Sequence, residues 1–539
     1  MISARDLLTS LVDSPVKQAG VALLSTLFFE DPAVATAGLL IAEGKIHYWP
    51  TVIGMGAGIT IADCFLYWLG WLFGITIQRG TWISPAQFDK AKDALERNLL
   101  GTVFLSRFLP GTRIPIYVGA GVLRAPFLSF LFVSAFAAYA WVFCLVKVSQ
   151  LVGERILPLL GDMKWWSLGA MIVGLIIYKI IQMRKPKKES VTSFFEFWPV
   201  WFFYLPVGFY YLWLAVRFRG LTLPSIANPS IYASGLCRES KAEIMGLVAE
   251  KDRALIAPFV THTKTDAPAT EQLATAMELL RAAGISFPII AKPDEGQRGV
   301  GVQRIEDEEA LAHYIEAFPA GLAIILQQLV DEPLEAAILY CRKPSESRGR
   351  IISMTFKSFP EVTGDGRATL RDLIKADQRA MILRDIYFQR HAARLDQVPA
   401  AGEVVPLVLS GSHSQGAVYT DAGQFVTPEL TAAVASVADG MREFYFARFD
   451  VRFSDLDAFQ RGEHLMIFEI NGAGAESSHV WDAKARLMRA YRALFRQWRF
   501  LFEIGAENRR RGMKTLPADE LIRGLRVTVA RSKMHPPAD

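Results

Sequence analysis

The chain has 539 residues, of which 51% are hydrophobic and 21% are charged, and its formal net charge is +5. Hydrophobic cores rarely extend beyond roughly 250–300 residues, so this length predicts at least two domains. The modest charge gives no reason to expect a nucleic-acid partner. The four cysteines form no CxxC pair and indicate neither a disulfide framework nor a zinc site. Long apolar windows dominate up to about Arg219 and charged residues are dense beyond it, which predicts a membrane half followed by a soluble half.

Five apolar windows precede Arg184 and predict an α-helical membrane domain over residues 1–185. Charged residues and prolines interrupt the first window at Glu30 and Asp31, and the third between Arg107 and Arg113. A charge at the centre of a bilayer costs at least about 2.5 kcal/mol, and broken backbone at that depth must face protein or water. We therefore expect two re-entrant loops, one acidic and one basic, whose tips neutralise each other. The windows cover residues 16–42, 52–77, 103–123, 127–152 and 168–183.

The third window contains a more specific pattern, RFLPGTRIPIYVGAGVL (107–123), with two arginines around a proline and a glycine-rich helix after them. Upstream lie FFEDP (28–32) and IADCFLYWLGWLFG (61–74). Together these segments resemble the DedA (SNARE-associated, or VTT) family over roughly residues 15–180. One departure is that Glu30 and Asp31 are adjacent, whereas many family members have two membrane acids that are well separated along the chain.

The resemblance implies a lipid transporter whose substrate is a phospholipid or a polyprenyl phosphate. In such a protein Arg107 and Arg113 would attract a phosphate headgroup, and Glu30 or Asp31 would balance their charge. The resemblance also implies Asp63, in the second helix, as a residue of the transport site. The alternative is that these charges pair only to hold a membrane anchor together. Buried charges in membranes are functional by default, which favours transport.

An aromatic stretch, residues 194–216, follows the basic cluster RKPKK (184–188). Its tryptophans and tyrosines favour an interfacial or re-entrant element at the level of the lipid headgroups, and a true span is the alternative. Residues 225–240 are rich in turn formers and predict a linker. Residues 186–241 are therefore expected to be a membrane-interfacial segment and linker between the two halves.

From Ala242 onward the pattern is mixed α and β, which predicts an α+β domain over residues 242–505 and a C-terminal tail over 506–539. The fold class expected for the whole chain is an α-helical membrane domain with two re-entrant loops, followed by this α+β domain. Thr270 is placed to cap the first helix. The predicted elements are an amphipathic helix over 270–283, a polar helix that begins at 370–374, and strands over 287–291, 323–327 and 464–470.

Four segments of the second half contain residues suited to nucleotide chemistry. In FPIIAKPDEGQRGVGVQRI (287–305) a strand delivers Lys292, and glycines follow whose backbone N–H groups can approach phosphate oxygens. In AIILQQLVDEPLEAAIL (323–339) a strand leads to Glu335, whose carboxylate can accept ribose hydroxyls. ARFDVRFSDLDAF (447–459) and HLMIFEINGAGAESSHVWD (464–482) each place two polar side chains on one strand face. The first pair is Arg448 and Asp450, and the second is Glu469 and Asn471. Asp450, Glu469 and Asn471 offer oxygen ligands of the kind that Mg²⁺ takes beside ATP phosphates.

The order of these segments resembles the ATP-grasp fold, in particular D-alanine–D-alanine ligases, and VTGDGRATLRDLI (362–374) is similar to cyanophycin synthetases. The resemblance covers roughly residues 242–499 and implies ATP with Mg²⁺ or Mn²⁺. It implies catalytic roles for Lys292, on the α- and β-phosphates, and for Arg448, on the acyl-phosphate. A second phosphate lysine is expected upstream, with Lys251 and Lys264 as candidates. The other implied residues are Gly296, Arg298, Gly299 and Gly301 over the γ-phosphate, Gln328 and Val330 at adenine, Glu335 at ribose, and Asp450, Glu469 and Asn471 as metal ligands.

Four further residues are candidates for the substrate side. GSHSQGAVYTD (411–421) lies where family members have a substrate loop, and it contains His413 and Gln415. Glu476 and His479 follow the metal-binding strand. The competing interpretation is structural, because an isolated histidine is more often structural than catalytic.

The resulting hypothesis is a membrane-bound ligase that activates a carboxylate as an acyl-phosphate and joins it to an amine, coupled to a lipid-handling domain. The alternative is a DedA-type transporter whose ATP-grasp domain is only a regulatory nucleotide-binding module. Expected partners are membrane lipids, ATP, small carboxylates and amines. The expected location is a bacterial inner membrane, crossed several times, with the ATP-grasp domain in the cytoplasm.

Overall fold

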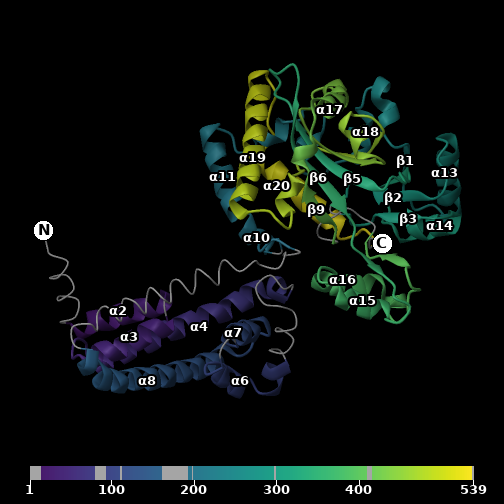
Figure 1. The fold of residues 1–539 in the computed structure, drawn as a ribbon. Coiled ribbons are helices and arrows are strands. Elements are labelled where there is room, and N and C mark those ends of the chain that lie inside the picture. The colour runs from purple at the N-terminus through teal and green to yellow at the C-terminus, as the bar shows by residue number, and fades with distance from the viewer. Residues whose placement is uncertain are drawn as a thin grey trace. The chain divides into compact units, whose positions relative to one another are not determined.

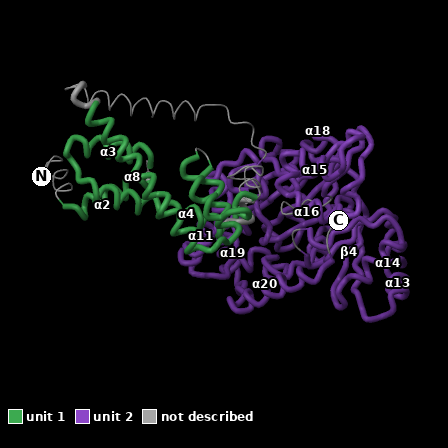
Figure 2. The backbone as a smooth tube through the Cα atoms, turned by 90° about the horizontal axis from the view of Figure 1, so that it is seen from below, with its two compact units in different colours: residues 1–189, 197–199 green, residues 190–196, 200–539 purple. Residues whose placement is uncertain are grey.

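The computed structural model describes residues 14–28, 30–78, 93–109, 112–160, 192–196, 198–296, 299–408 and 416–536. The chain divides into two compact units, which Figure 2 colours separately: residues 1–189 with 197–199 (unit 1) and residues 190–196 with 200–539 (unit 2). The described part of unit 1 is helical, and unit 2 combines antiparallel sheets with helices (Figure 1). The predicted helical half and α+β half are therefore confirmed. The apolar window 168–183 lies outside the described residues.

The third charged window of unit 1 is a broken helix, divided between α6 and α7, and charged residues and a proline occur at the break. The first window contains α2 and α3, and residue 29 between them lies outside the described residues. Segments Tyr48–Leu72 and Phe127–Arg155 are long and apolar enough to cross a membrane, by length and composition. The placement of the charged windows within a bilayer stays a prediction. The helices are α2 (Pro15–Phe28), α3 (Glu30–Ala42), α4 (Tyr48–Gln78), α6 (Leu99–Ser106), α7 (Arg113–Val122) and α8 (Phe127–Leu160).

Two glycines allow α4 and α7 to touch through their backbones. A Cβ atom added to Gly70 would lie 2.0 Å from the Val118 carbonyl oxygen, and one added to Gly121 would lie 2.0 Å from the Tyr67 carbonyl oxygen. Small residues of this kind allow two membrane helices to approach closely. The Tyr67 ring then packs beside Phe130, with ring centroids 4.8 Å apart. The glycines therefore set the separation of α4 and α7.

The smaller sheet of unit 2 has the antiparallel strand order β1-β4-β2-β3. Apolar side chains of α13 and α14 form one buried cluster with this sheet. The strands expected near 287–291 and 323–327 are confirmed. The expected cap is wrong: α13 begins at Ala269 with Pro268 before it, so Thr270 lies inside the first turn. The elements are β1 (Phe259–Thr263), α13 (Ala269–Ala282), β2 (Ile289–Pro293), β3 (Gln303–Ile305), α14 (Glu308–Ala317) and β4 (Ala323–Gln328).

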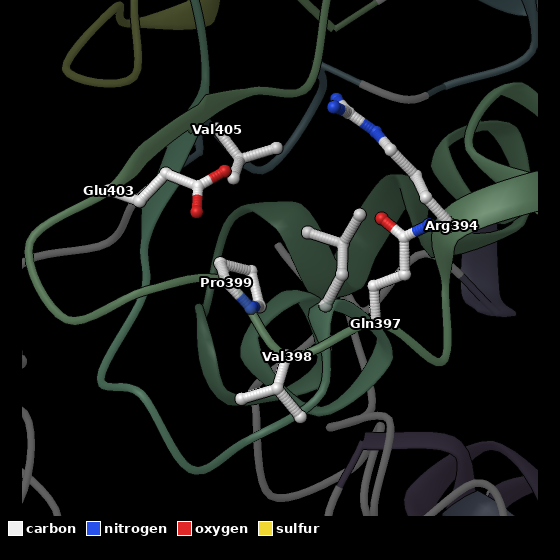
Figure 3. A pocket seen from close by; sticks show the side chains of 7 residues that line it. Arg394, Gln397, Val398, Pro399, Glu403 and Val405 are labelled. Carbon is white, nitrogen blue, oxygen red and sulfur yellow. The ribbon is translucent and has the colours of Figure 1, made fainter.

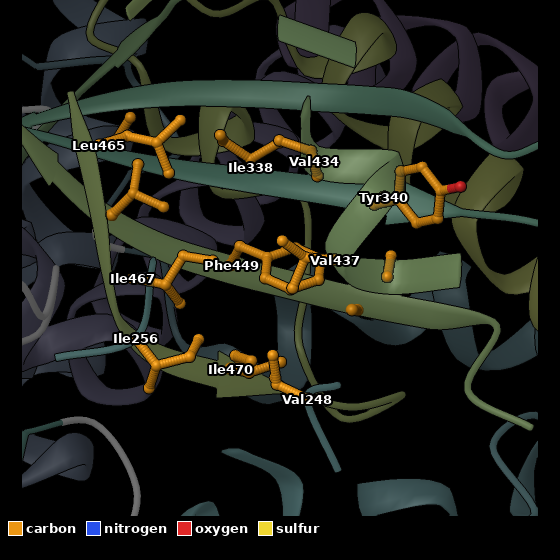
Figure 4. Close-up of a cluster of buried hydrophobic side chains, with 14 of the residues drawn as sticks. Val248, Ile256, Ile338, Tyr340, Val434, Val437, Phe449, Leu465, Ile467 and Ile470 are labelled. Carbon is orange, nitrogen blue, oxygen red and sulfur yellow. The ribbon is translucent and has the colours of Figure 1, made fainter. Parts of the chain in front are cut away.

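The larger sheet has the antiparallel order β11-β10-β5-β6-β9. Apolar residues alternate with polar ones along β10, and Phe449 joins Ile338 and Val434 in the buried cluster under α17 (Figure 4). The intervening polar side chains therefore lie on the opposite face of the sheet. β11 confirms the strand predicted over 464–470. The elements are β5 (Leu334–Cys341), β6 (Arg350–Ser358), β9 (Val418–Asp421), α17 (Pro428–Gly440), β10 (Phe446–Phe453) and β11 (Leu465–Asn471).

An insertion between β6 and β9 forms a separate two-stranded sheet of β7 (Glu361–Thr363) and β8 (Val404–Pro406) with two helices beside it. The helices are α15 (Leu370–Ala376), which confirms the predicted polar helix, and α16 (Arg384–Arg390). A pocket lies in this insertion (Figure 3), and none of the predicted ATP or metal residues lines it. Its lining residues are Leu370, Arg394, Gln397, Val398, Pro399, Glu403 and Val405.

The aromatic stretch near residue 200 forms α10 (Val200–Phe203) and α11 (Leu205–Arg217), and α11 packs on α19 (Leu487–Arg510). A helix of 13 residues is about 20 Å long at 1.5 Å per residue. The hydrocarbon core of a bilayer is about 30 Å thick, so α11 alone is too short to span it. The alternative of a true span by this helix is therefore not supported.

The predicted linker and tail are integral parts of unit 2. Asn228 is fully buried, and its side chain accepts hydrogen bonds from the backbone N–H groups of Tyr445 and Phe446. The linker prediction is wrong because turn-forming residues can be buried when their polar groups are hydrogen-bonded. The expected tail also departs from the prediction, since α19 continues to Arg510 and is followed by α20 (Ala518–Ser532).

Candidate functional site

Four charged side chains of unit 1 form one cluster. Arg107 Nη1 lies 3.3 Å from both carboxylate oxygens of Asp63, and Arg113 Nε lies 2.8 Å from one of them. Glu30 accepts hydrogen bonds from both arginines. The Asp63 and Arg107 side chains are 0% and 1% exposed, against 20% for Glu30 and 23% for Arg113. Two arginines therefore face two carboxylates, and such pairing lowers the cost of burying the charges.

The structure brings together four of the five predicted membrane residues and separates the fifth. Asp31 is exposed, and it accepts a hydrogen bond from Trp141 Nε1 at 3.2 Å. Consecutive helix residues point about 100° apart, so Glu30 and its neighbour cannot both face the cluster. The second acid is instead Asp63 of α4. The expected pairing of acidic and basic segments is present, and its role in transport stays a prediction.

The predicted metal residues meet on β10 and β11. Antiparallel pairing places Asp450 opposite Glu469 and Arg448 opposite Asn471. Arg448 Nη2 and Asn471 Nδ2 lie 3.0 and 3.3 Å from the same oxygen of Asp450, which is 2% exposed. Residues from two separate sequence motifs thus form one polar row, on the sheet face opposite α17.

Lys357 of β6 is a central residue that the sequence motifs did not reveal. Its Nζ lies 3.0 Å from Asp450 Oδ1 and 3.1 Å from Glu335 Oε1. Burial by itself would lower the pKa of Lys357, but the two carboxylates outweigh it and raise that pKa above its usual value. Burial would raise the pKa of Asp450, and Arg448 with Lys357 holds it below its usual value instead. Both signs of charge are therefore kept in this buried row at neutral pH.

Lys292 connects the smaller sheet to β11 of the larger sheet. Its Nζ donates to Gln327 Oε1 at 2.8 Å and to the Phe468 carbonyl oxygen at 3.0 Å, next to Glu469. Burial lowers the pKa of Lys292 to about 8, and the charge of Glu469 acts in the opposite direction. The amine is therefore protonated at neutral pH and offers a positive charge to phosphate groups.

A second lysine beside this site is Lys241 of α12 (Lys241–Gly246). It is 5% exposed, and its Nζ donates to the Gly296 carbonyl oxygen at 2.7 Å. Its charge contributes to the lowered pKa of Lys292. Lys251 and Lys264, the candidates from the sequence, make their hydrogen bonds elsewhere. The lysine that the structure places near Lys292 is instead Lys241, and a second phosphate lysine stays a prediction.

The glycine-rich turn after β2 depends on glycine for its backbone. Gly299 and Gly301 have φ angles of +73° and +76°, a region that side chains disfavour. A Cβ atom on Gly301 would also lie 2.8 Å from Pro293 Cγ. Arg298 lies outside the described residues. The turn geometry accounts for these two glycines, so the binding of γ-phosphate by Gly296, Gly299 and Gly301 stays a prediction.

The predicted adenine and ribose residues are held by other side chains of unit 2. The Gln328 amide exchanges hydrogen bonds with the Ser286 backbone at 3.3 and 3.4 Å. Arg452 donates to the Val330 carbonyl oxygen at 2.9 Å and to Glu335 at 3.3 Å. Glu335 also pairs with the lysine that bonds Asp450. The roles at adenine and ribose therefore stay predictions.

Glu239 is a further buried acid that the sequence motifs did not indicate. Its carboxylate accepts a hydrogen bond from the Gly472 N–H at 2.8 Å, directly after Asn471. Burial raises the pKa of Glu239 to about 7, while the charge of Lys241 opposes the rise. A carboxyl group that titrates near neutral pH beside the end of β11 is suited to proton transfer.

The two described substrate candidates share the loop between β11 and α19, which contains η9 (Ser478–Trp481). Glu476 accepts hydrogen bonds from the Tyr204 hydroxyl and from Trp481 Nε1. His479 Nδ1 lies 2.6 Å from Ser353 Oγ, and burial lowers the histidine pKa. His413 and Gln415 lie outside the described residues. We call residues 476–481 the acceptor loop, and its substrate role stays a prediction.

The donor chemistry of the polar row fits a magnesium ion better than a transition metal. In the described part of the chain, no group of three or more His, Cys, Asp or Glu is placed to hold a metal ion. The predicted set has two carboxylates, Asp450 and Glu469, and the amide of Asn471. Mg²⁺ prefers oxygen ligands, keeps several waters and takes phosphate oxygens of a bound nucleotide, so a small protein set is sufficient.

Known proteins match the helical unit with its cluster of two arginines and two acids. Residues 29–151 match the VTT domain. Undecaprenyl phosphate transporter A of Bacillus subtilis (strain 168) is 27% identical over 154 residues, which cover 28% of this chain and 78% of that protein. Inner membrane protein YabI of Escherichia coli (strain K12) is 27% identical over 110 residues, which cover 20% of this chain and 43% of that protein. Unit 1 therefore contains a VTT (DedA) domain.

Solved structures similar to about half of the chain include three ATP-grasp ligases. VanG D-Ala:D-Ser ligase of Enterococcus faecalis is 12% identical with a TM-score of 0.29, covering 50% of this chain and 62% of its own. D-alanine–D-alanine ligase of Bacillus anthracis, complexed with ATP, is 12% identical with a TM-score of 0.27, and the match covers 52% of this chain and 70% of that structure's chain. A bifunctional glutathione synthetase of Pasteurella multocida is 14% identical with a TM-score of 0.25, and this chain spans only 38% of it. These are distant likenesses.

Proposed function

We propose that unit 2 is an ATP-dependent ligase that activates a carboxylate as an acyl-phosphate and joins it to an amine or similar nucleophile. The observation that supports this most directly is the meeting of the two sheets. Lys292 of the smaller sheet contacts the strand that holds Glu469, and Asp450 with Lys357 lies in the adjoining row of the larger sheet. Cations for a polyphosphate and oxygens for its metal thus come from two different sheets.

The arrangement suggests a division of roles in the reaction. Asp450, Glu469 and Asn471 would hold Mg²⁺, which when bound neutralises and orients the phosphates. Lys292 would bind the α- and β-phosphates, and Arg448 would stabilise the charge that develops on the transferred phosphoryl group. A carboxylate oxygen of the substrate attacks the γ-phosphorus and ADP leaves. An amine then attacks the acyl carbon, phosphate leaves, and the amine proton passes to a base, for which Glu239 is the candidate.

The test is phosphate release by the full-length protein in lipid nanodiscs with ATP, Mg²⁺ and mixtures of amino acids. Lys292→Ala and Glu469→Ala are expected to abolish it, because each removes a charge that faces the nucleotide. Lys264→Ala is the matched control, since that partly exposed lysine bonds the Glu316 carbonyl oxygen and lies outside the cluster. Release that persists in both site variants contradicts the proposal.

For unit 1 we propose the handling of a lipid phosphate, with the two charged windows as re-entrant loops in a bacterial inner membrane and unit 2 in the cytoplasm. The supporting observation is that Arg113 is more exposed than Arg107 while both bond the same acids. A phosphate could then replace one carboxylate at the exposed arginine. The name of the B. subtilis relative suggests a polyprenyl phosphate. If Arg113→Ala leaves the translocation of polyprenyl phosphate in vesicles unchanged, this role is wrong.

A regulatory nucleotide-binding module is the second candidate function for unit 2. It would bind ATP with the same lysines but would not need Arg448 beside a complete set of metal ligands. The two functions separate in one experiment, because a regulator binds Mg–ATP without any substrate-dependent release of phosphate. Substrate-independent binding together with ATP-stimulated lipid translocation would favour the regulator.

A further inference from the structure

Helix α11 is apolar on two opposite faces, and unit 2 covers only one of them. On the covered face the Tyr210 ring stacks on Phe495 of α19 with centroids 4.4 Å apart, and Leu214 is fully buried. Tyr211 packs on Trp498 and Phe502 from the same side. This packing places α11 along α19 at one side of unit 2 (Figure 1).

The opposite face of α11 remains exposed over its whole length. Its five large apolar residues recur at the spacing of one helical stripe, and their exposed fractions lie between 48% and 79%. A surface helix of a soluble domain normally presents polar residues on this side, so the stripe needs an apolar environment of its own. We call it the α11 apolar face. Its residues are Leu205, Phe209, Leu212, Trp213 and Val216.

The charges around the α11 apolar face are predominantly positive. Residues 200–219 contain no Asp or Glu and end with Arg217 and Arg219. On α19, Arg492 and Arg499 are exposed and lie three residues before and four residues after Phe495, so they flank the ring that holds α11. Arg499 also pairs with Glu503 at 2.8 Å. An apolar stripe with basic residues at its border is typical of helices that lie in the interface of an anionic bilayer. The same chain also contains a VTT domain at residues 29–151, and a membrane domain in the same chain would keep unit 2 close to a bilayer.

The segment that bears this face also holds the acceptor loop. Tyr204, between α10 and α11, donates its hydroxyl hydrogen bond to Glu476. The neighbouring Phe203 packs on Trp481 with ring centroids 4.6 Å apart and stacks on Tyr491 at 5.4 Å. A displacement of α10 and α11 would therefore displace the loop that follows the metal-binding strand.

We infer that the α11 apolar face lies in the headgroup layer of an anionic membrane and that Tyr204 thereby positions the acceptor loop at the lipid surface. The acceptor of the ligase reaction is then an amphiphile that stays in the bilayer while its polar head reacts. The docking of α11 is independent of the proposed function, whereas the class of acceptor rests on it.

Docking is tested with the full chain in nanodiscs of phosphatidylcholine and phosphatidylglycerol. The exposed or partly exposed native thiols are removed by Cys64→Ala and Cys144→Ala, because Cys237 and Cys341 are buried. An environment-sensitive fluorophore is attached at Phe209→Cys or, as a control, at Ala274→Cys on the exposed side of α13, which lies on the other side of unit 2 (Figure 1). We expect a blue shift and quenching by spin-labelled lipid at position 209, and neither at position 274.

Two results would overturn the docking. Emission at position 209 that matches an aqueous probe would show that the face is in water. A blue shift without quenching by spin-labelled lipid would show that protein covers it, whether another part of this chain or a second copy. Leu212→Asp should abolish the quenching while Mg–ATP affinity stays unchanged, so a folding defect is distinguished from loss of docking.

The acceptor class is tested by phosphate release with ATP, Mg²⁺ and either the lipid extract or the aqueous extract of the cells that make the protein. Stimulation by the lipid extract is expected. Tyr204→Phe, which keeps the ring and removes the hydroxyl, should raise several-fold the amount of lipid needed for half-maximal release without changing Mg–ATP affinity. Stimulation by the aqueous extract alone overturns the acceptor assignment and leaves the ligase standing. Failure of the ligase itself is recognised separately, because Mg–ATP then binds or fails to bind without phosphate release in either extract or with any mixture of amino acids, and the acceptor assignment falls with it.

Discussion

The two charged clusters of this protein use similar chemical groups in opposite ways. In unit 1 each of the two arginines and two acids hydrogen-bonds to an opposite charge. In unit 2 the row is incomplete within the described residues: the Glu469 carboxylate makes no hydrogen bond or ion pair there, and Arg448 Nε is buried without a partner. A polar group buried without a partner costs free energy, so it is retained when it has a ligand to bind.

The difference suggests that the cluster of unit 1 serves mainly stability and the row of unit 2 mainly binding. The cluster of unit 1 is satisfied in the absence of ligand, so its charges hold the helices together and must rearrange to admit a phosphate. The row of unit 2 leaves the Glu469 carboxylate and Arg448 Nε without a partner among the described residues, and under the proposed function these groups would bind a metal and a nucleotide. Substitutions in the first cluster should therefore act mainly on folding, and substitutions of the unpaired groups in the second should act mainly on turnover.

The largest effect is expected from Arg107→Met. This substitution leaves Asp63 buried with one arginine fewer, and removing one partner of a buried ion pair typically costs about 3–5 kcal/mol. We expect a loss of that size in the free energy of unfolding of unit 1, measured in mixed micelles with increasing SDS. A variant as stable as the parent protein would show that the cluster does not hold the helices together.

The next-largest effect is a loss of turnover that leaves the stability of unit 2 unchanged. Glu469→Gln removes a carboxylate that makes no bond within the described chain, so the Tm of unit 2 should not change. Phosphate release should fall by about 100-fold or more, because a group that faces developing charge is lost. Asp450→Asn is the contrasting variant and should lose both activity and stability, since Lys357 and Arg448 depend on its charge. Equal destabilisation by the two variants would contradict the distinction.

A smaller effect follows from the pKa of Lys292, which burial lowers to about 8. Phosphate binding favours the protonated amine, so ATP affinity should be constant below pH 8. Above pH 8 affinity should fall by at most about tenfold per pH unit, as one proton must be taken up on binding. Lys357, whose pKa is raised, stays charged over this range. Affinity of Mg–ATP measured by calorimetry from pH 7 to 9 checks this, and Lys292→Arg should remove the dependence.

The smallest effect is expected at Asp31. Asp31→Asn changes an exposed side chain whose one described hydrogen bond comes from Trp141, so neither stability nor lipid translocation should change measurably. Glu30→Gln, one residue earlier, should lower both because it weakens the bonds to both arginines. If the two variants behave alike, the separation of these neighbours in the structure has no functional meaning.

The division into two halves and the chemical types at each site could be predicted from local patterns in the sequence. Apolar windows, their interruption at Glu30 and between Arg107 and Arg113, and the alternation along β10 are local patterns, and local patterns follow from helix and strand periodicity. The pairs Arg448 with Asp450 and Glu469 with Asn471 could be placed on one face of each strand for the same reason. Their meeting across β10 and β11 required only that two successive strands pair.

The residues from distant segments that complete the sites could be found only in the folded chain. Lys357 meets Asp450 because β6 and β10 both flank β5. Lys241, which directly follows the segment that resembled a linker, bonds the Gly296 carbonyl oxygen and lies near Lys292. Asp63 joins the arginines because two glycines bring α4 and α7 into contact. The second apolar face of α11 became visible only when α19 covered the first. Each of these contacts depends on strand register or helix packing between distant segments, which composition and spacing along the chain do not encode.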